Sequence, residues 1–89
     1  MLDLYQFEAC PYSAHVRAKM SEWEIDYILR NVSKDKSKRH RLKKVSGQNS
    51  VPTLIDSSRN VVITGNEKKI IAYLRRHYQP HANPLARCP

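Results

Sequence analysis

The sequence of 89 residues predicts a single α/β domain in which helices cover both faces of a mixed four-stranded sheet. Three observations carry this prediction. A short strand pattern is followed by a helical pattern and a second strand pattern, and such a unit pairs its strands in parallel by a right-handed crossover. Two β-branched runs on either side of a polar segment indicate an antiparallel hairpin. A last helical pattern follows, so the predicted order is β-α-β-α-β-β-α.

The first half of the chain predicts a strand, a helix and a second strand. Residues 2–7 alternate between two mainly apolar sets of side chains, which is typical of a short strand buried on both faces. Residues 11–23 carry apolar side chains at helical spacing and begin with Pro11, which suits the first helical position because its missing N–H is not needed there. Residues 25–32 are rich in β-branched and aromatic side chains and predict the second strand.

The middle of the chain predicts a helix and a hairpin. Residues 34–45 indicate a helix anchored by Leu42 and Val45, and the glycine that follows is a signal for its end. Residues 51–55 and 61–64 predict the two strands of the hairpin, joined by a polar turn.

The last predicted helix covers residues 66–78, where apolar side chains recur at helical spacing and Asn66 can cap the first turn. Three prolines and no apolar period follow from Gln79 onward. We therefore expect one domain over residues 1–78 and a flexible tail over residues 79–89.

The net charge of +8 is unevenly placed along the chain. Residues 30–44 contain eight lysines and arginines against a single acid, Asp35. Such a block could meet nucleic acid, an anionic membrane or an acidic partner. It lacks interleaved aromatic residues for stacking on bases, so we expect a solvated helix face and no nucleic-acid partner, with a specific polyanion site as the alternative.

The remaining bulk properties indicate a small protein of the cytoplasm. No apolar run is long enough to span a bilayer, and the N-terminus lacks the basic and apolar regions of a signal peptide. The two cysteines, Cys10 and Cys88, are too few for a disulfide framework. We expect a cytoplasmic monomer without membrane contact.

The tetrapeptide Cys10-Pro11-Tyr12-Ser13 carries the strongest chemical signal. It follows the first strand and opens the first helix, so the Cys10 sulfur should face the free N–H groups of Tyr12 and Ser13 and the positive end of the helix dipole. Both favour the thiolate, which is the nucleophile. The Ser13 hydroxyl can add a hydrogen bond, while Glu8 would oppose ionisation. We interpret Cys10 as reactive rather than as an inert buried cysteine.

Two further segments point to a binding site. The Val51-Pro52 step is compatible with a cis peptide bond, although a proline that merely opens a strand is the alternative. At Gly65-Asn66-Glu67 a tight turn brings backbone N–H groups to the start of a helix, which is a natural seat for a carboxylate. Ordinary helix capping is the alternative there.

In these three segments the chain resembles the glutaredoxins of the thioredoxin-like superfamily, over roughly residues 2–78. Cys10-Pro11-Tyr12-Ser13 is similar to the family's C-P-Y-C site, with serine in the resolving position. Residues 46–52 resemble the segment G-Q-x-[TS]-V-P, in which the family's proline is cis. Residues 64–67 open the helix where the family binds the γ-glutamyl end of glutathione. The pair Asn66-Glu67 is also similar to a pair in the N-terminal domains of glutathione transferases.

The resemblance implies a thioredoxin-like fold and a glutathione-dependent thiol–disulfide oxidoreductase. Its partners would be glutathione, as co-substrate, and glutathionylated or disulfide-containing proteins, and no metal is expected. The implied catalytic residues are Cys10, Tyr12 and Ser13. The implied contacts of glutathione are Cys10, Tyr12, Gln48, Val51, Pro52, Gly65, Asn66 and Glu67.

Serine at position 13 restricts the chemistry that the resemblance implies. Because Ser13 cannot close a disulfide with Cys10, we expect a monothiol route in which Cys10 takes glutathione from a mixed disulfide and a second glutathione resolves it. Cys88 as a resolving thiol is one alternative. A glutathione-ligated iron–sulfur carrier is another, although such monothiol relatives carry C-G-F-S. A catalytically weak binding or adaptor module is a third.

Position 7 is the main departure from the family pattern. Glutaredoxins usually place a lysine three residues before the catalytic cysteine, where it meets the glycine carboxylate of glutathione, and this chain has Phe7. Gln48 matches a family residue that reaches the same carboxylate, and a base from residues 34–41 could assist it. The substitution puts the strength of glutathione binding and the pKa of Cys10 in doubt.

Overall fold

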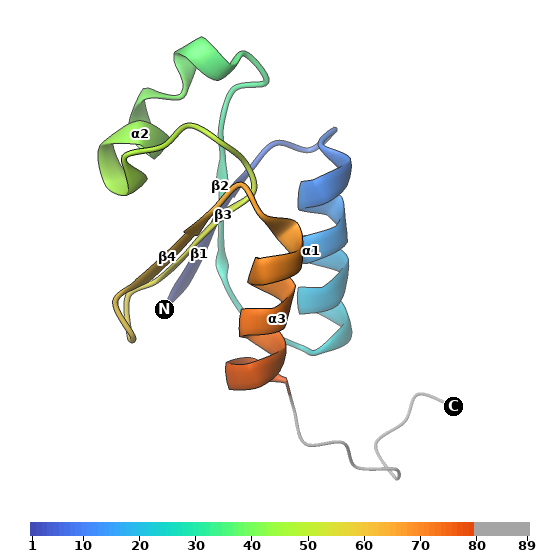
Figure 1. The fold of residues 1–89 in the computed structure, drawn as a ribbon. Helices are drawn as coiled ribbons and strands as arrows, with labels where there is room; N and C mark the ends of the chain where they lie inside the picture. The colour runs from blue at the N-terminus through green and yellow to red at the C-terminus, as the bar shows by residue number, and fades with distance from the viewer. Residues whose placement is uncertain (80–89) are drawn as a thin grey trace, which may run out of the picture.

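The computed structural model describes residues 1–79, and its elements follow the predicted order (Figure 1). Cys88 and most of the predicted tail over residues 79–89 lie outside the described residues. The elements are β1 (Leu2–Gln6), α1 (Pro11–Glu22), β2 (Ile28–Asn31), the short 3₁₀ helix η1 (Lys36–Lys38), α2 (His40–Ser46), β3 (Thr53–Asp56), β4 (Val61–Thr64) and α3 (Glu67–Tyr78).

The four strands form one mixed sheet in the order β2-β1-β3-β4. The central strand β1 pairs in parallel with β2, where Leu4 lies opposite Leu29, and antiparallel with β3, where Leu4 lies opposite Leu54. Strands β3 and β4 form the predicted antiparallel hairpin. The mixed sheet is therefore confirmed, and β1, buried on both faces, is its centre.

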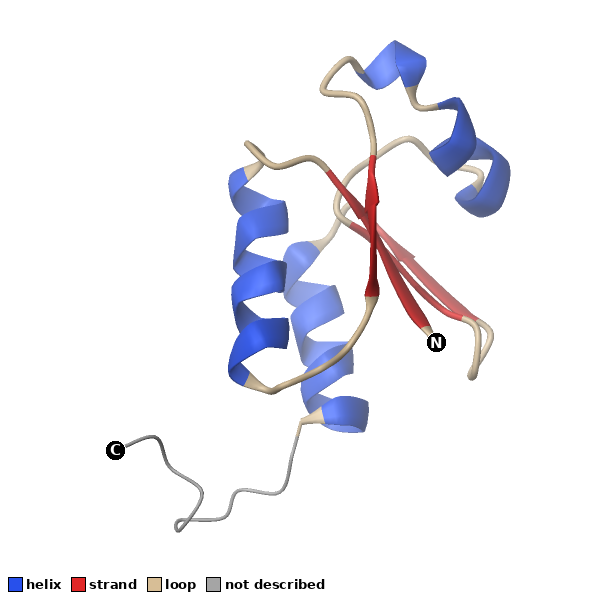
Figure 2. Ribbon diagram, turned by 180° about the vertical axis from the view of Figure 1, so that it is seen from behind, coloured by secondary structure: helices blue, strands red, loops and turns tan. Residues whose placement is uncertain are grey.

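Helices α1 and α3 lie together on one side of the sheet, and α2 lies on the other side (Figures 1 and 2). The main core fills the space between the sheet and the α1–α3 pair, and each fully buried aliphatic side chain stabilises it by about 1.5–3 kcal/mol. The buried core residues are Leu2, Leu4, Val16, Met20, Trp23, Leu54, Ile63, Ile70, Ile71 and Leu74.

The helix predicted over residues 34–45 is divided into η1 and α2, so this prediction was partly wrong. Arg39 breaks it, with φ −94° and ψ 52°, and its side chain turns inward. No apolar side chain precedes Leu42 in this segment, so nothing anchors a first helical turn to the sheet. Leu42 is buried as predicted, whereas Val45, the other expected anchor, is 44% exposed.

Three strands are shorter than predicted, and β1 ends at Gln6, one residue earlier than expected. Strand β2 covers only Ile28–Asn31, at the edge of the sheet, where Ile28 and Leu29 are partly exposed. Strand β3 begins at Thr53, so Val51 and Pro52 lie in the loop before it. Among residues 1–79, no helix is long and apolar enough to cross a bilayer. The monomeric state and the cytoplasmic location stay predictions.

Candidate active site at the start of α1

Cys10 occupies the N-cap position of α1, as the sequence predicts. Its backbone is extended, with φ −74° and ψ 118°, and its Sγ accepts a hydrogen bond from the N–H of Ser13 at 3.5 Å. Pro11 then takes the first helical position. The residue is only 5% exposed. The thiol is thus held against the free N–H groups that begin the helix.

The pKa of Cys10 lies below that of an ordinary thiol. Burial alone would raise this pKa, but hydrogen bonds from the Ser13 hydroxyl and from the backbone N–H groups of Ser13 and Tyr12 outweigh it, with help from the positive charge of Arg39. The Ser13 hydroxyl is fully buried and has no hydrogen-bond partner of normal geometry among residues 1–79, so its O–H is free to donate to a thiolate at Cys10. The site favours a thiolate nucleophile.

Glu8, expected to oppose ionisation, lies apart from this network. Its carboxylate is 86% exposed and 3.6 Å from the guanidinium of Arg17. Solvent and this arginine screen its charge.

Arg39 contributes to the site from the opposite side of the sheet. It is 7% exposed, and its guanidinium donates to the carbonyl oxygens of Ser33 (2.8 Å), Asn49 (2.8 Å) and Lys34 (3.2 Å). The same group lies 5.3 Å from the centre of the Phe7 ring, in a cation–π contact. The positive charge of Arg39 therefore lies next to Phe7, the residue found where the family usually has a lysine. The sequence predicts a solvated helix face here and a base from residues 34–41 near the site. It did not identify Arg39 as that base or as buried, although its spacing of three from Leu42 is a signal of a shared buried face.

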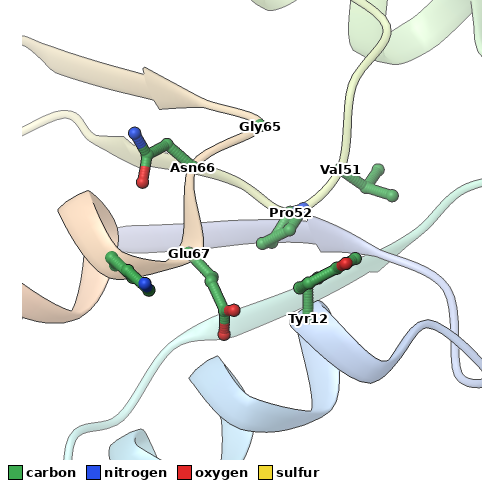
Figure 3. A pocket seen from close by; sticks show the side chains of 7 residues that line it. Tyr12, Val51, Pro52, Gly65, Asn66 and Glu67 are labelled. Atoms are coloured by element: carbon green, nitrogen blue, oxygen red, sulfur yellow. The ribbon is translucent and has the colours of Figure 1, made fainter.

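A cavity of about 200 Å³ lies between the start of α1, the loop before β3 and the start of α3 (Figure 3). Tyr12, which is 58% exposed, forms one wall. The segments before β3 and before α3, far apart in the sequence, form the others. The lining residues are Tyr12, Val51, Pro52, Gly65, Asn66, Glu67 and Lys68.

The two loops of this cavity are held in contact by their backbones. The Val51–Pro52 peptide bond is cis. The Pro52 carbonyl accepts a hydrogen bond from the Gly65 N–H at 2.8 Å. Gly65 has φ +63°, and a Cβ added to it would lie 2.8 Å from the Cβ of Ser50. Glycine is therefore required at this position by its backbone conformation and by the closeness of the neighbouring loop.

The polar side chains at the start of α3 have separate roles. The Asn66 side chain caps the helix, accepting from the Lys69 N–H at 3.0 Å, and points away from Tyr12 and Pro52 (Figure 3). The Glu67 carboxylate is 2.6 Å from the Nδ1 of His15 on α1. Its side chain is 18% exposed and lies at the cavity wall. Asn66 therefore lines this cavity with its backbone, and Glu67 lines it with its negatively charged carboxylate.

The structure brings together most of the predicted site residues. Cys10 and Ser13 do not line the cavity but lie at the buried start of the helix from which Tyr12 projects. Gln48 lines neither this cavity nor the second one described below, and it is exposed. Lys68 lines the cavity and was missed, because its sequence context is that of an ordinary surface lysine.

The described residues contain no group of three or more histidine, cysteine, aspartate or glutamate side chains that could hold a metal ion. What they do present is a sulfur nucleophile beside a small cavity. Its walls offer backbone N–H groups at a helix start, a carboxylate from Glu67 and an ammonium from Lys68. This arrangement can hold a zwitterionic or peptide-like ligand next to a thiolate.

Comparisons with known proteins agree with this geometry. The sequence model of the glutaredoxin family matches residues 2–58, which is more than half of the chain. No curated protein sequence matches it. Among solved structures, glutathione S-transferase unclassified 2 from Bombyx mori matches with a TM-score of 0.74 and 26% identity, over 88% of this chain and 36% of that chain.

Two further transferase structures match the same fold. Isozyme E7 from Drosophila melanogaster has a TM-score of 0.73 and 31% identity, over 88% of this chain and 35% of its own. A transferase homologue from Drosophila mojavensis, solved with bound glutathione, has a TM-score of 0.76 and 25% identity, over 88% and 35%. The chain thus spans about a third of the length of these transferases. The shared part is the thioredoxin-like fold, as predicted.

Proposed function

Because the chain belongs to the glutaredoxin family, we propose that it is a glutathione-dependent thiol–disulfide oxidoreductase that reduces glutathione mixed disulfides by a monothiol route. The observation that carries the proposal is the thiol of Cys10. It caps α1, accepts the Ser13 N–H and has a lowered pKa, while serine stands where a resolving cysteine would be needed. Such a thiol can attack a disulfide but cannot close one within its own tetrapeptide.

The reaction requires two exchanges. The Cys10 thiolate attacks the glutathione sulfur of a protein–glutathione disulfide, the protein thiolate leaves, and Cys10 is left disulfide-bonded to glutathione. The thiolate of a second glutathione then attacks the glutathione sulfur of this intermediate. Glutathione disulfide forms, and the Cys10 thiolate is restored. The protein cysteine is reduced, and free glutathione supplies the electrons.

The cavity fits the γ-glutamyl half of glutathione. The backbone N–H groups at the start of α3, around Asn66 and Glu67, suit its carboxylate, and the Glu67 side chain suits its ammonium. The Val51 backbone, at the cavity wall, is available to pair with the extended peptide. Tyr12 would cover the bound molecule from the α1 side.

The glycine carboxylate of glutathione needs a cation elsewhere, because Phe7 cannot supply one. Arg39 is the candidate, because its charge already acts on Cys10 and it lies over Phe7. Three of its five N–H donors bond to backbone carbonyls, which leaves two for a ligand. Gln48 is the second candidate through the family resemblance.

The proposal is tested by turnover of a small glutathione mixed disulfide in the presence of glutathione. We expect Cys10→Ser to abolish turnover and Cys88→Ser, the matched control, to leave it within about twofold. Mass spectrometry of the wild-type protein after one exchange should show glutathione on Cys10. Turnover by the Cys10→Ser protein would refute the proposal.

Conjugation of glutathione to an electrophile is a second candidate function, favoured by the match to transferase structures over 88% of the chain. It uses the same glutathione seat but leaves Cys10 unmodified. Conjugation of 1-chloro-2,4-dinitrobenzene, without turnover of the mixed disulfide, would select this function over disulfide reduction.

A further inference from the structure

A second cavity, of about 250 Å³, lies beside η1 and α2. We call it the basic pocket; it is lined by Lys36, Ser37, Arg39, His40, Lys43 and Asn49. Four of these six side chains are basic and none is a carboxylate. The concave surface therefore presents several cationic groups around one small space.

The cations of the basic pocket outnumber the acidic groups near them. The single acid nearby, Asp35, acts by its charge on Arg39, and one of its carboxylate oxygens accepts the N–H and O–H of Ser37, at 3.0 and 2.7 Å. The ion pairs found among residues 1–79 involve other cations, and none includes Lys36, Arg39 or Lys43. The charges of Lys36 and Lys43 are thus available to an external anion.

The basic pocket is connected to the active site through Arg39. This side chain lines the pocket, contacts the Phe7 ring and lowers the pKa of Cys10 by its charge. It also donates to the Asn49 carbonyl, and Asn49 lies two residues before Val51 of the first cavity. The basic pocket and the Cys10 thiol are thus linked by one side chain, Arg39.

We propose that the basic pocket docks acidic side chains of the protein substrate whose glutathione mixed disulfide Cys10 attacks. This inference rests on the proposed function and adds a substrate class to it, namely cysteines flanked by glutamate or aspartate. The volume suits one or two carboxylates and is smaller than an ordinary pocket for a small organic ligand.

An acidic protein fits this surface better than a nucleic acid does. The nearby aromatic rings are already covered, Phe7 by Arg39 and Tyr5 by Arg41. Base stacking on a single strand needs exposed aromatic faces. A basic surface without free aromatic rings favours carboxylate ligands over nucleic acid bases. Electrostatic complementarity of this kind acts mainly on the association rate.

The test compares two glutathionylated peptides that differ only in flanking glutamates or glutamines. At low salt, we expect the acidic peptide to have a kcat/KM about tenfold higher, through KM, and the preference to vanish near 0.5 M NaCl. The double variant Lys36→Glu, Lys43→Glu should lose this preference. The matched control Lys69→Glu, Arg76→Glu carries the same charge change on exposed positions of α3 and should keep it.

The outcomes separate this inference from the proposed function. Equal kcat/KM for both peptides, or equal loss of preference in both double variants, would overturn the docking role. Tighter binding of a single-stranded RNA than of the acidic peptide, lost in Lys36→Glu, Lys43→Glu, would overturn it in favour of nucleic acid. If neither peptide is turned over, the proposed function fails. NMR shifts of residues 36–43 on adding the unmodified acidic peptide would then still decide the docking role.

Discussion

The imidazole Nδ1 of His15 lies 2.6 Å from the Oε2 of Glu67 and ties α1 to the start of α3 across the wall of the first cavity. The His15 side chain is 51% exposed, so this contact contributes little to stability, at most about 1 kcal/mol. Its effect is to orient the Glu67 carboxylate, which is the negative charge at the cavity wall.

Glu67→Gln should weaken the binding of glutathione about tenfold or more. The variant keeps the shape of the side chain and removes the charge that pairs with the ligand's ammonium, a charge-assisted hydrogen bond worth about 1.5–3 kcal/mol. Calorimetric titration measures the change. The control is a glutathione analogue without the α-amino group, whose affinity should change little. An equal loss of affinity for both ligands would show that the Glu67 carboxylate does not pair with the ammonium of glutathione.

His15→Ala should weaken glutathione binding less, by about two- to fivefold, since it only frees the Glu67 carboxylate. His15→Gln, which retains an N–H donor, should restore part of the affinity. Thermal unfolding of all three proteins should agree within a few degrees. Full affinity in His15→Ala would show that the contact does not position Glu67.

Ser13→Ala should raise the pKa of Cys10. The variant removes the buried hydroxyl that favours the thiolate and leaves the backbone N–H in place. The rate of alkylation by iodoacetamide against pH measures this pKa. The wild-type midpoint should lie below that of an ordinary thiol, and the variant's should lie between the two. A midpoint unchanged by the substitution would show that the backbone N–H groups and the charge of Arg39 lower this pKa without the hydroxyl.

The same lowered pKa has a thermodynamic consequence with a defined sign. Between the folded and the ordinary pKa of Cys10, the unfolded chain binds more protons than the folded one. The reduced protein therefore gains stability as pH rises through this window, and the gain is complete above the ordinary thiol value. Cys10→Ser should lack this gain, which urea unfolding at several pH values would detect.

Local chemical signals explain what could be predicted from the sequence. Cys10 and Asn66 cap helices as expected because capping depends on a residue and its next three neighbours. Gly47 ends α2 in the left-handed conformation for the same local reason. The contact of Arg39 with Phe7 and the contact of His15 with Glu67 could not be predicted, because each depends on segments far apart in the sequence meeting in the fold. Arg39 is one of eight basic residues between positions 30 and 44, and its spacing from Leu42 alone does not identify it as the buried one.

Two substitutions of Arg39 can separate the effect of its positive charge on the pKa of Cys10 from the effect of its hydrogen bonds on stability. Arg39→Lys keeps the positive charge but cannot donate to three carbonyls in the planar fork, so it should lower the melting temperature by several degrees and change the pKa of Cys10 little. Arg39→Gln should lower the melting temperature and also raise that pKa. Identical alkylation profiles for the two variants would show that the charge does not act on Cys10.

Asp56, at the end of β3, should control the acid stability of the fold. Its carboxylate is fully buried and accepts the hydroxyls of Tyr73 and Tyr78 at 2.6 and 2.5 Å. Burial would raise its pKa, but these two bonds and the backbone N–H groups of Ser58 and Arg59 lower it overall. Asp56→Asn should cost about 3 kcal/mol at pH 7.

The pH dependence of this cost follows from the direction of the Asp56 pKa. A carboxyl whose pKa is lowered by folding contributes its full stability above the ordinary value of about 4, and the contribution is lost as pH falls through the lowered value. Urea unfolding of wild type and Asp56→Asn should therefore differ most at neutral pH and converge in acid. Tyr78→Phe, which removes one donor and keeps the charge, should cost about 1–2 kcal/mol and raise the midpoint of acid unfolding. A constant difference between wild type and Asp56→Asn from pH 7 to pH 2 would show that the buried group is not ionised in the folded protein.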